Sequence, residues 1–174
     1  RATRGQDSPL ALRYHTAVES VTTSRIIPTT PHQHLYECWI DANNHSEMTG
    51  AGASSDPKVG GAFTAWDGYI ERTYVELTPY AHIVQRWRTV EFPLEAPDSL
   101  LEMVLKSSNG GTLLTLNHSE LPDGQGSSYK AGRASNYFDP MTTYFQYCLP
   151  IRPGALLSNP RPRAKIRPTT FDRS

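Results

Sequence analysis

The chain has 174 residues, 17 of them basic and 17 acidic, with a formal net charge of zero. This length suits one domain that buries roughly 70% of its unfolded surface. No apolar run approaches the roughly 20 residues of a membrane-spanning helix, so no membrane span is expected, and no nucleic-acid partner is expected either.

The charge is unevenly distributed along the chain. Residues 18–149 contain 8 basic and 15 acidic residues, a net of −7, whereas residues 150–174 contain six basic residues and one acidic residue, a net of +5. An acidic body with a basic, proline-rich tail is typical of an interaction arm, and a solvated tail without a partner is the open alternative. The candidate partner contacts in this tail are Arg152, Arg161, Arg163, Lys165 and Arg167.

The two cysteines, Cys38 and Cys148, are too few for a disulfide framework or a zinc site. Both fall on apolar faces of expected helices, which favours buried thiols in a reducing, intracellular compartment. The chain begins at Arg1, and its Arg-bearing, acid-poor start fits a processed or truncated terminus, such as the remnant left by an organellar transit peptide. A mitochondrial or other organellar location is therefore expected, with the cytoplasm as the alternative.

The N-terminal part predicts an irregular arm over residues 1–17, then a strand over residues 18–27 that Pro28 ends. Thr30 is expected to be the N-cap of a first helix, with Pro31 as its first helical residue. The buried face of this helix is expected to carry Leu35, Cys38 and Trp39.

A short second helix is expected over residues 44–49, ending at Gly50, and residues 51–58 are expected to form a loop. Strands are then expected at 59–66 and 69–77 around Asp67-Gly68, because Gly accepts the positive φ of a primed hairpin turn.

The chain is then expected to turn at residues 78–81 and to continue as a strand over 82–90, a loop over 92–99, and two strands over 100–106 and 112–118. Asn109-Gly110 joins the last two strands as a hairpin. Consecutive hairpins predict an antiparallel meander, with the first strand free to join an edge. The alternation within the third of these five strands places one set inward, Ile83, Gln85 and Trp87, and the other outward, Val84, Arg86 and Arg88.

The last element is a helix expected over residues 127–148, with a kink near Pro140, which lacks a backbone donor. One apolar stripe follows it, formed by Tyr137, Met141, Tyr144, Phe145 and Cys148. The predicted organisation is thus an arm over 1–17, a domain over 18–149 and a tail over 150–174.

This order of elements resembles the α+β helix-grip fold. In that fold a curved antiparallel sheet, of about six strands here, surrounds a long C-terminal helix, with two short helices after the first strand. Four segments make the resemblance more specific, namely Asp56-Pro57-Lys58-Val59-Gly60-Gly61-Ala62-Phe63, Ala65-Trp66-Asp67-Gly68-Tyr69-Ile70, Ile83-Val84-Gln85-Arg86-Trp87-Arg88 and Tyr137-Phe138-Asp139-Pro140-Met141. In these segments the chain resembles the activator of Hsp90 ATPase homologue 1-like (AHSA1-type) family of the START/Bet v 1-like (SRPBCC) superfamily.

The resemblance implies a cavity between sheet and helix. It also implies Hsp90 as a possible partner, on the basis of the family likeness alone. Two departures accompany it. The family often has Gly-Trp where this chain has Gly132-Arg133, which puts a charge at a place that is usually packed or pocket-lining. The separate N-terminal domain by which the full co-chaperone engages Hsp90 has no counterpart in these 174 residues.

The sequence shows no nucleophile elbow, phosphate loop, dinucleotide fingerprint or metal-ligand cluster, so no catalytic residue, metal or cofactor is predicted. Residues two apart on a helix point in different directions, which excludes a shared metal for His32 with His34. The same geometry excludes a shared metal for His45 with Glu47. His118 is expected to be a structural histidine, with the cavity mouth as its alternative position.

Arg86 and Glu102 are expected on a solvated outer face of the sheet, with a pocket ion pair as the alternative.

Three functions stay open. The first is a non-enzymatic domain that binds an apolar small molecule or a protein partner, the second an accessory subunit of a large, organellar assembly anchored by its tails, and the third a cyclase-type enzyme. The candidate ligand-cavity residues, which alternatively fill a closed core, are Trp39, Phe63, Trp66, Trp87, Leu105, Leu116, Tyr137, Met141 and Phe145.

Overall fold

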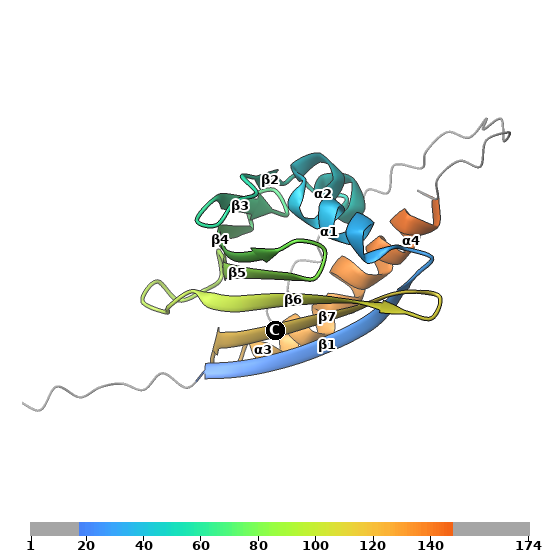
Figure 1. Ribbon diagram of the computed structural model, residues 1–174. Coiled ribbons are helices and arrows are strands. Elements are labelled where there is room, and N and C mark those ends of the chain that lie inside the picture. The colour runs from blue at the N-terminus through green and yellow to red at the C-terminus, as the bar shows by residue number, and fades with distance from the viewer. Residues whose placement is uncertain (1–17, 148–174) are drawn as a thin grey trace, which may run out of the picture.

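The structure is a computed structural model that describes residues 18–147 (Figure 1). Within this range, strand β1 and two short helices precede a run of six strands, and a long helical element follows it. In order the elements are β1 (Val18–Pro28), α1 (His32–Ile40), α2 (Ala42–Thr49), β2 (Ser54–Ser55), β3 (Ala62–Ala65), β4 (Ile70–Thr78), β5 (His82–Thr89), β6 (Ser99–Ser108), β7 (Gly111–Pro122), α3 (Gly126–Arg133), the π-helical segment η1 (Ala134–Phe138) and α4 (Asp139–Tyr147).

The strands form one antiparallel sheet in the order β1-β7-β6-β5-β4-β3-β2. The predicted meander with the first strand at an edge is therefore confirmed. The sheet has seven strands because β2 lies inside the stretch expected to be a loop. Ser54 and Ser55 of β2 pair with Thr64 and Phe63 of β3, and the hydroxyls of Ser54 and Thr64 lie 2.8 Å apart.

Both predicted hairpin tips are confirmed. Asp67 and Gly68 have φ of 56° and 85°, and the amide of Tyr69 donates to the carbonyl of Trp66 at 3.0 Å. Gly110 has φ of 92° and lies between the paired residues at the ends of β6 and β7. Glycine is needed at these positions because a side chain would strain the left-handed backbone.

The start of α1 differs from the prediction. The N-cap is Pro31, and no side chain caps the helix. The hydroxyl of Thr30 donates instead to the carbonyl of Pro28 at 2.9 Å, while the Thr30 carbonyl accepts from the hydroxyl of Thr112 at 2.7 Å. Thr30 therefore joins the end of β1 to β7 and is not the predicted cap.

Helix α2 begins two residues earlier than predicted, because the carboxylate of Asp41 accepts from the amide of Asn44 at 2.8 Å and so provides the N-terminal cap. It ends at Gly50, as predicted, with φ of 81°. None of the helices within residues 18–147 is long and apolar enough to cross a membrane.

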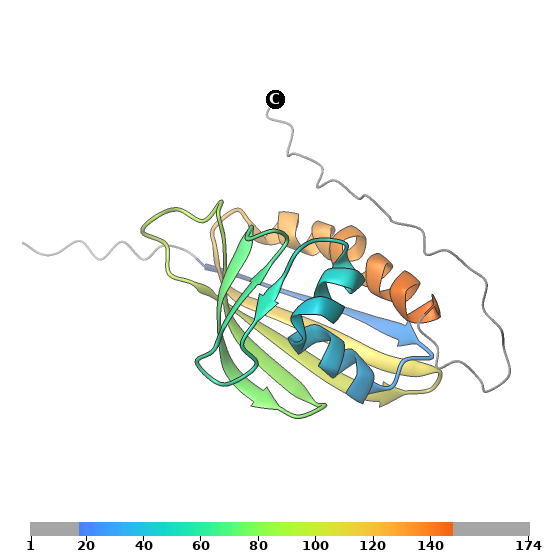
Figure 2. The same ribbon diagram turned by 90° about the horizontal axis from the view of Figure 1, so that it is seen from above.

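The C-terminal helical element lies along the sheet, with the pair α1–α2 beside it (Figure 2). Its irregularity is a π turn, in which the amide of Asp139 donates to the carbonyl of Ala134 five residues earlier. The predicted disturbance near Pro140 thus takes the form of one wider turn directly before the proline. Tyr137 and Phe138 are both buried within this turn, whereas the predicted end at Cys148 lies outside the described residues.

The core is continuous between sheet and helices. Ile83, Gln85 and Trp87 are buried along β5, so the predicted inward face of this strand is confirmed. Val84, which was placed on the outward face, is also buried, because β5 is a central strand and Val84 has Glu76 of β4 and Glu102 of β6 opposite it. Trp66 was expected to be largely buried and is only partly so. It follows β3 at the hairpin tip with φ of 55°, where it packs against the edge of the core.

Replacing Trp87 by Ala should lower the free energy of unfolding by about 3–5 kcal/mol, because a side chain only 3% exposed is lost and a cavity remains. Trp66→Ala, at the partly buried site, should have a clearly smaller effect. Urea unfolding of the two variants and the parent measures both, and equal losses would contradict the assignment of Trp87 to the centre of the core.

Candidate functional site

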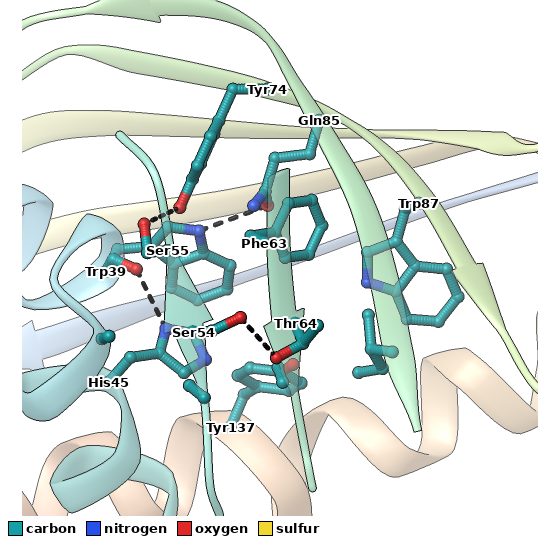
Figure 3. A pocket seen from close by; sticks show the side chains of 14 residues that line it. Trp39, His45, Ser54, Ser55, Phe63, Thr64, Tyr74, Gln85, Trp87 and Tyr137 are labelled. Carbon is teal, nitrogen blue, oxygen red and sulfur yellow. Dashed lines mark hydrogen bonds between the residues drawn. The ribbon is translucent and has the colours of Figure 1, made fainter. Parts of the chain in front are cut away.

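A cavity lies between the sheet, the two short helices and η1 (Figure 3). Side chains from α1, α2, β2 to β5 and η1 line it. Its volume is about 10 Å³, which is room for roughly one water molecule. Small-molecule sites in proteins typically enclose about 300–1,000 Å³. Within the described residues this cavity, which we call the closed interior, is therefore too small for such a ligand.

The nine predicted cavity residues divide into three groups. Four of them line this cavity, namely Trp39, Phe63, Trp87 and Tyr137. Four are buried in the core without lining it, namely Leu105, Leu116, Met141 and Phe145. Trp66 lies at the edge, its ring centroid 6.1 Å from that of Tyr137.

His45 of α2 is a cavity residue that the sequence analysis missed (Figure 3). Its Nδ1 donates to the carbonyl of Trp39 at 3.0 Å, whereas its buried Nε2 has no hydrogen-bond partner. Burial lowers its pKa, so the imidazole is neutral. The signal was present in the helical spacing, since His45, Met48 and Thr49 are the buried residues of α2.

A second buried polar group surrounds Arg133, the last residue of α3. Its Nη2 donates to Nδ1 of His118 at 2.7 Å. Nε2 of His118 then donates to the hydroxyl of Ser99 at 2.8 Å, and Ser99 donates to the carbonyl of Trp87 at 2.8 Å. This chain of bonds, the Arg133–His118–Ser99–Trp87 network, requires a neutral His118 that is protonated on Nε2.

The electrostatics agree with that protonation state. Burial, together with the charge of Arg133, lowers the pKa of His118 to about 2. Burial also lowers the pKa of Arg133, while the neighbouring hydroxyls of Tyr137 and Tyr129 act in the opposite direction. The guanidinium carbon lies 5.8 Å from the ring centroid of Trp87 and 5.5 Å from that of Tyr137. Within residues 18–147 no carboxylate forms an ion pair with Arg133, so aromatic faces and one imidazole take the place of a counter-ion.

The remaining histidine candidates have structural contacts. Nδ1 of His32 lies 3.1 Å from the hydroxyl of Ser107, and the ring nitrogens of His34 lie 3.9 and 4.0 Å from the sulfur of Cys38. His118 is buried and hydrogen-bonded, as predicted. The described part of the chain has no group of three or more His, Cys, Asp or Glu side chains placed to hold a metal ion.

The alternative ion pair between Arg86 and Glu102 is not formed. Arg86 pairs with Glu120 at 2.6 Å, and Glu102 lies 2.8 Å from Nε2 of His82. Both residues are part-exposed on the outer face of the sheet, as predicted. The candidate partner contacts in the basic tail lie outside the described residues, so their role stays a prediction.

Comparisons with known proteins give a consistent result. Residues 29–146 match the family described as Activator of Hsp90 ATPase homolog 1-like protein. The human protein named activator of 90 kDa heat shock protein ATPase homolog 1 is 25% identical over 142 residues, which are 82% of this chain and 41% of the relative. The chain thus spans less than half the length of the curated relatives it matches.

Solved structures share the fold. The crystal structure titled as PFC0360w, an HSP90 activator from Plasmodium falciparum, has a TM-score of 0.63 at 23% identity, over 74% of this chain and 96% of that one. DynU16, from the dynemicin biosynthetic locus, has a TM-score of 0.61 at 17% identity, over 73% of this chain and 47% of that one. Identities this low show a common fold only.

The His118 geometry predicts an acid-sensitive fold. Above the ordinary pKa of 6.5 the imidazole is neutral in both the folded and the unfolded chain. Below it, the unfolded chain binds a proton that the folded chain, with a pKa of about 2, does not bind. The contribution of neutral His118 to the free energy of unfolding is therefore fully present above pH 6.5. It decreases as the pH falls, by about 2 kcal/mol at pH 5. Denaturant unfolding of the parent and His118→Asn at pH 7 and pH 5 should show a smaller loss for the variant, and an equal loss would contradict the prediction.

Proposed function

The chain belongs to the Activator of Hsp90 ATPase homolog 1-like protein family, and from this premise we propose that it is a non-enzymatic domain that binds a protein partner through its outer surface. The partner class to be tested first is an Hsp90 chaperone, which the names of the relatives indicate.

The observation that carries this proposal is the closed interior. A cavity of about 10 Å³ does not hold a lipid, a sterol or another apolar ligand. Beside this cavity, the buried polar groups of Arg133, His118 and Ser99 bond to one another and to the backbone. In the cavity lining, Nε2 of His45 is buried without a hydrogen-bond partner, which is no feature of a site for an apolar ligand. A protein partner on the surface leaves this buried network intact.

One solved chain supports a single domain of this kind as a binding unit, whereas this chain covers only 41% of the curated relatives. The Plasmodium falciparum chain titled an HSP90 activator is covered over 96% of its length by the fold described here.

The full chain should bind purified human Hsp90 with a measurable dissociation constant by isothermal titration calorimetry, and it should raise the rate of ATP hydrolysis by Hsp90. The reason is the family relationship together with the closed interior, which directs recognition to the surface. Absence of binding at 100-fold the protein concentrations that saturate the human relative would contradict an Hsp90 partner. Extraction of the purified chain with organic solvent is the control, and a stoichiometric apolar compound in the extract would favour the ligand-binding alternative.

A second candidate function is an accessory subunit of a larger, organellar assembly, with residues 150–174 as a strap on a neighbouring protein. The contrast between a body of net −7 and a tail of net +5 favours it, because a tail rich in arginine and proline is suited to extended, charge-guided contacts.

Truncation after Leu149 tests whether the tail is a strap on a neighbouring protein or packs on its own domain. If the tail is a strap, the truncated chain keeps its melting temperature, while its association with co-purifying proteins weakens, and more so at higher salt because exposed charge pairs are screened. Thermal melts and salt-dependent co-purification measure the two effects. A truncated chain that melts earlier and keeps the same partners would show that the tail packs on its own domain.

A further inference from the structure

We propose that the loop between β5 and β6, residues 90–98, is a preorganised docking element for a basic, aliphatic segment of a protein partner. The inference rests on the proposed function and assigns it a place on the surface. In Figure 1 this loop extends beyond the end of the sheet.

The loop exposes aliphatic side chains to an unusual degree. Leu94 is 89% exposed, the highest value among the large apolar side chains of residues 18–147, and Val90 is 72% exposed. Single apolar residues on a surface are ordinary, but here two of them border one groove of about 360 Å³. Glu71, Arg88, Thr89 and Phe92 complete the lining of this groove.

Arg88 holds the loop in its shape. Its guanidinium donates at 2.6 Å to the carbonyl of Pro93 and at 2.6 Å to that of Ala96. It also reaches the carbonyl of Leu94 at 3.3 Å and the carboxylate of Asp98 at 3.3 Å. The Arg88 side chain is only 14% exposed, so these bonds are largely protected from water.

The near end of the loop is fixed to the core. The ring of Phe92 is buried and packs edge-on against Trp87, with centroids 6.0 Å apart. The guanidinium carbon of Arg88 lies over the same Phe92 ring, 5.5 Å from its centroid. An exposed leucine on a backbone that is already ordered loses little conformational entropy when it is covered, which is the condition for an efficient contact residue.

The charges around the groove define the partner. Arg72 pairs with Glu71 and with Asp98, and Arg88 pairs with Asp98. Glu91 and Glu95 are exposed and form no ion pair among the described residues. The four carboxylates and the two guanidinium groups of this region together give a net charge of −2 around the exposed aliphatic side chains. The complementary ligand is a segment with one or two aliphatic side chains between Lys or Arg residues.

The first test uses the full chain and purified human Hsp90. Leu94→Asn should weaken binding about ten-fold, because a contact residue at the centre of an interface contributes more than about 1 kcal/mol. The matched control is Val59→Asn, at another exposed valine, 65% exposed and outside the groove, which should bind as the parent does. Unchanged melting temperatures of both variants confirm intact folds. A Leu94→Asn protein that binds Hsp90 as tightly as the parent overturns the inference.

The second test does not depend on Hsp90. The probe is the synthetic peptide acetyl-Lys-Arg-Leu-Leu-Arg-Lys-amide, compared with a twin in which Glu replaces every Lys and Arg. Two-dimensional amide NMR of the full chain should show the basic peptide shifting residues 90–98 and Glu71, with no shift from the acidic twin. If Hsp90 does not bind but the basic peptide maps to the loop, the Hsp90 proposal fails and the docking element stands. Shifts elsewhere, shifts of equal size from both peptides, or no shift overturn the docking element.

Two further experiments distinguish two other occupants. If a second copy of the chain covers the loop, the parent will dimerise with rising concentration in sedimentation velocity and Leu94→Asn will not. If the chain's own tail covers it, reversing the charge of Arg161, Arg163, Lys165 and Arg167 to Glu in the full chain will shift the amides of residues 90–98. Either result would replace the partner segment as the occupant and overturn the proposal.

Discussion

The hydrogen bonds from Arg133 through His118 and Ser99 to the carbonyl of Trp87 join the C-terminal helical element to three neighbouring strands, β7, β6 and β5. A buried guanidinium without a carboxylate is unfavourable unless each lost water contact is replaced. The neutral imidazole and the two aromatic faces supply that replacement only while the helix lies directly on the sheet. The close approach of the C-terminal helical element to β5, β6 and β7 is therefore tied to this network.

The features that the sequence predicted well depend on local chemistry. Asp67-Gly68 and Asn109-Gly110 form hairpin tips because a positive φ at glycine is a property of a few neighbouring residues. Trp87 could be placed inside because strand alternation has a period of two. Thr30 was assigned wrongly because its environment depends on a distant segment, since the hydroxyl of Thr112 donates to the carbonyl of Thr30. Trp66 was assigned wrongly for a local reason, because its own left-handed backbone, next to those of Asp67 and Gly68, takes it out of strand alternation.

The site shows the same division between local and distant causes. The aromatic lining was predictable from apolar periodicity, and Gly132-Arg133 was recognised as a departure from the family pattern. Periodicity does not report how closely sheet and helix approach, so it could not show that the cavity shrinks to about 10 Å³. It also could not pair Arg133 with His118, because that contact depends on the register of β7 against β6 and on the position of the helix above both. His45 was assessed only as a metal ligand, although its helical spacing with Met48 marked it as buried.

Strand β5 connects the closed interior with the surface proposed to bind a partner. Trp87 points inward, where its carbonyl ends the buried network and its ring meets Phe92. Arg88, the next residue, points to the opposite face and holds the loop that presents Leu94. Because adjacent residues of a strand face opposite sides, one element supports both the core and the loop, and the ring of Phe92 contacts both Trp87 and Arg88. Substitutions at the exposed tip of such a loop alter the surface while the core packing stays the same, which is how one fold serves different partners. Trp87 is thus one of the core residues that line the small cavity, and Arg88 fixes the backbone of the loop on the other face.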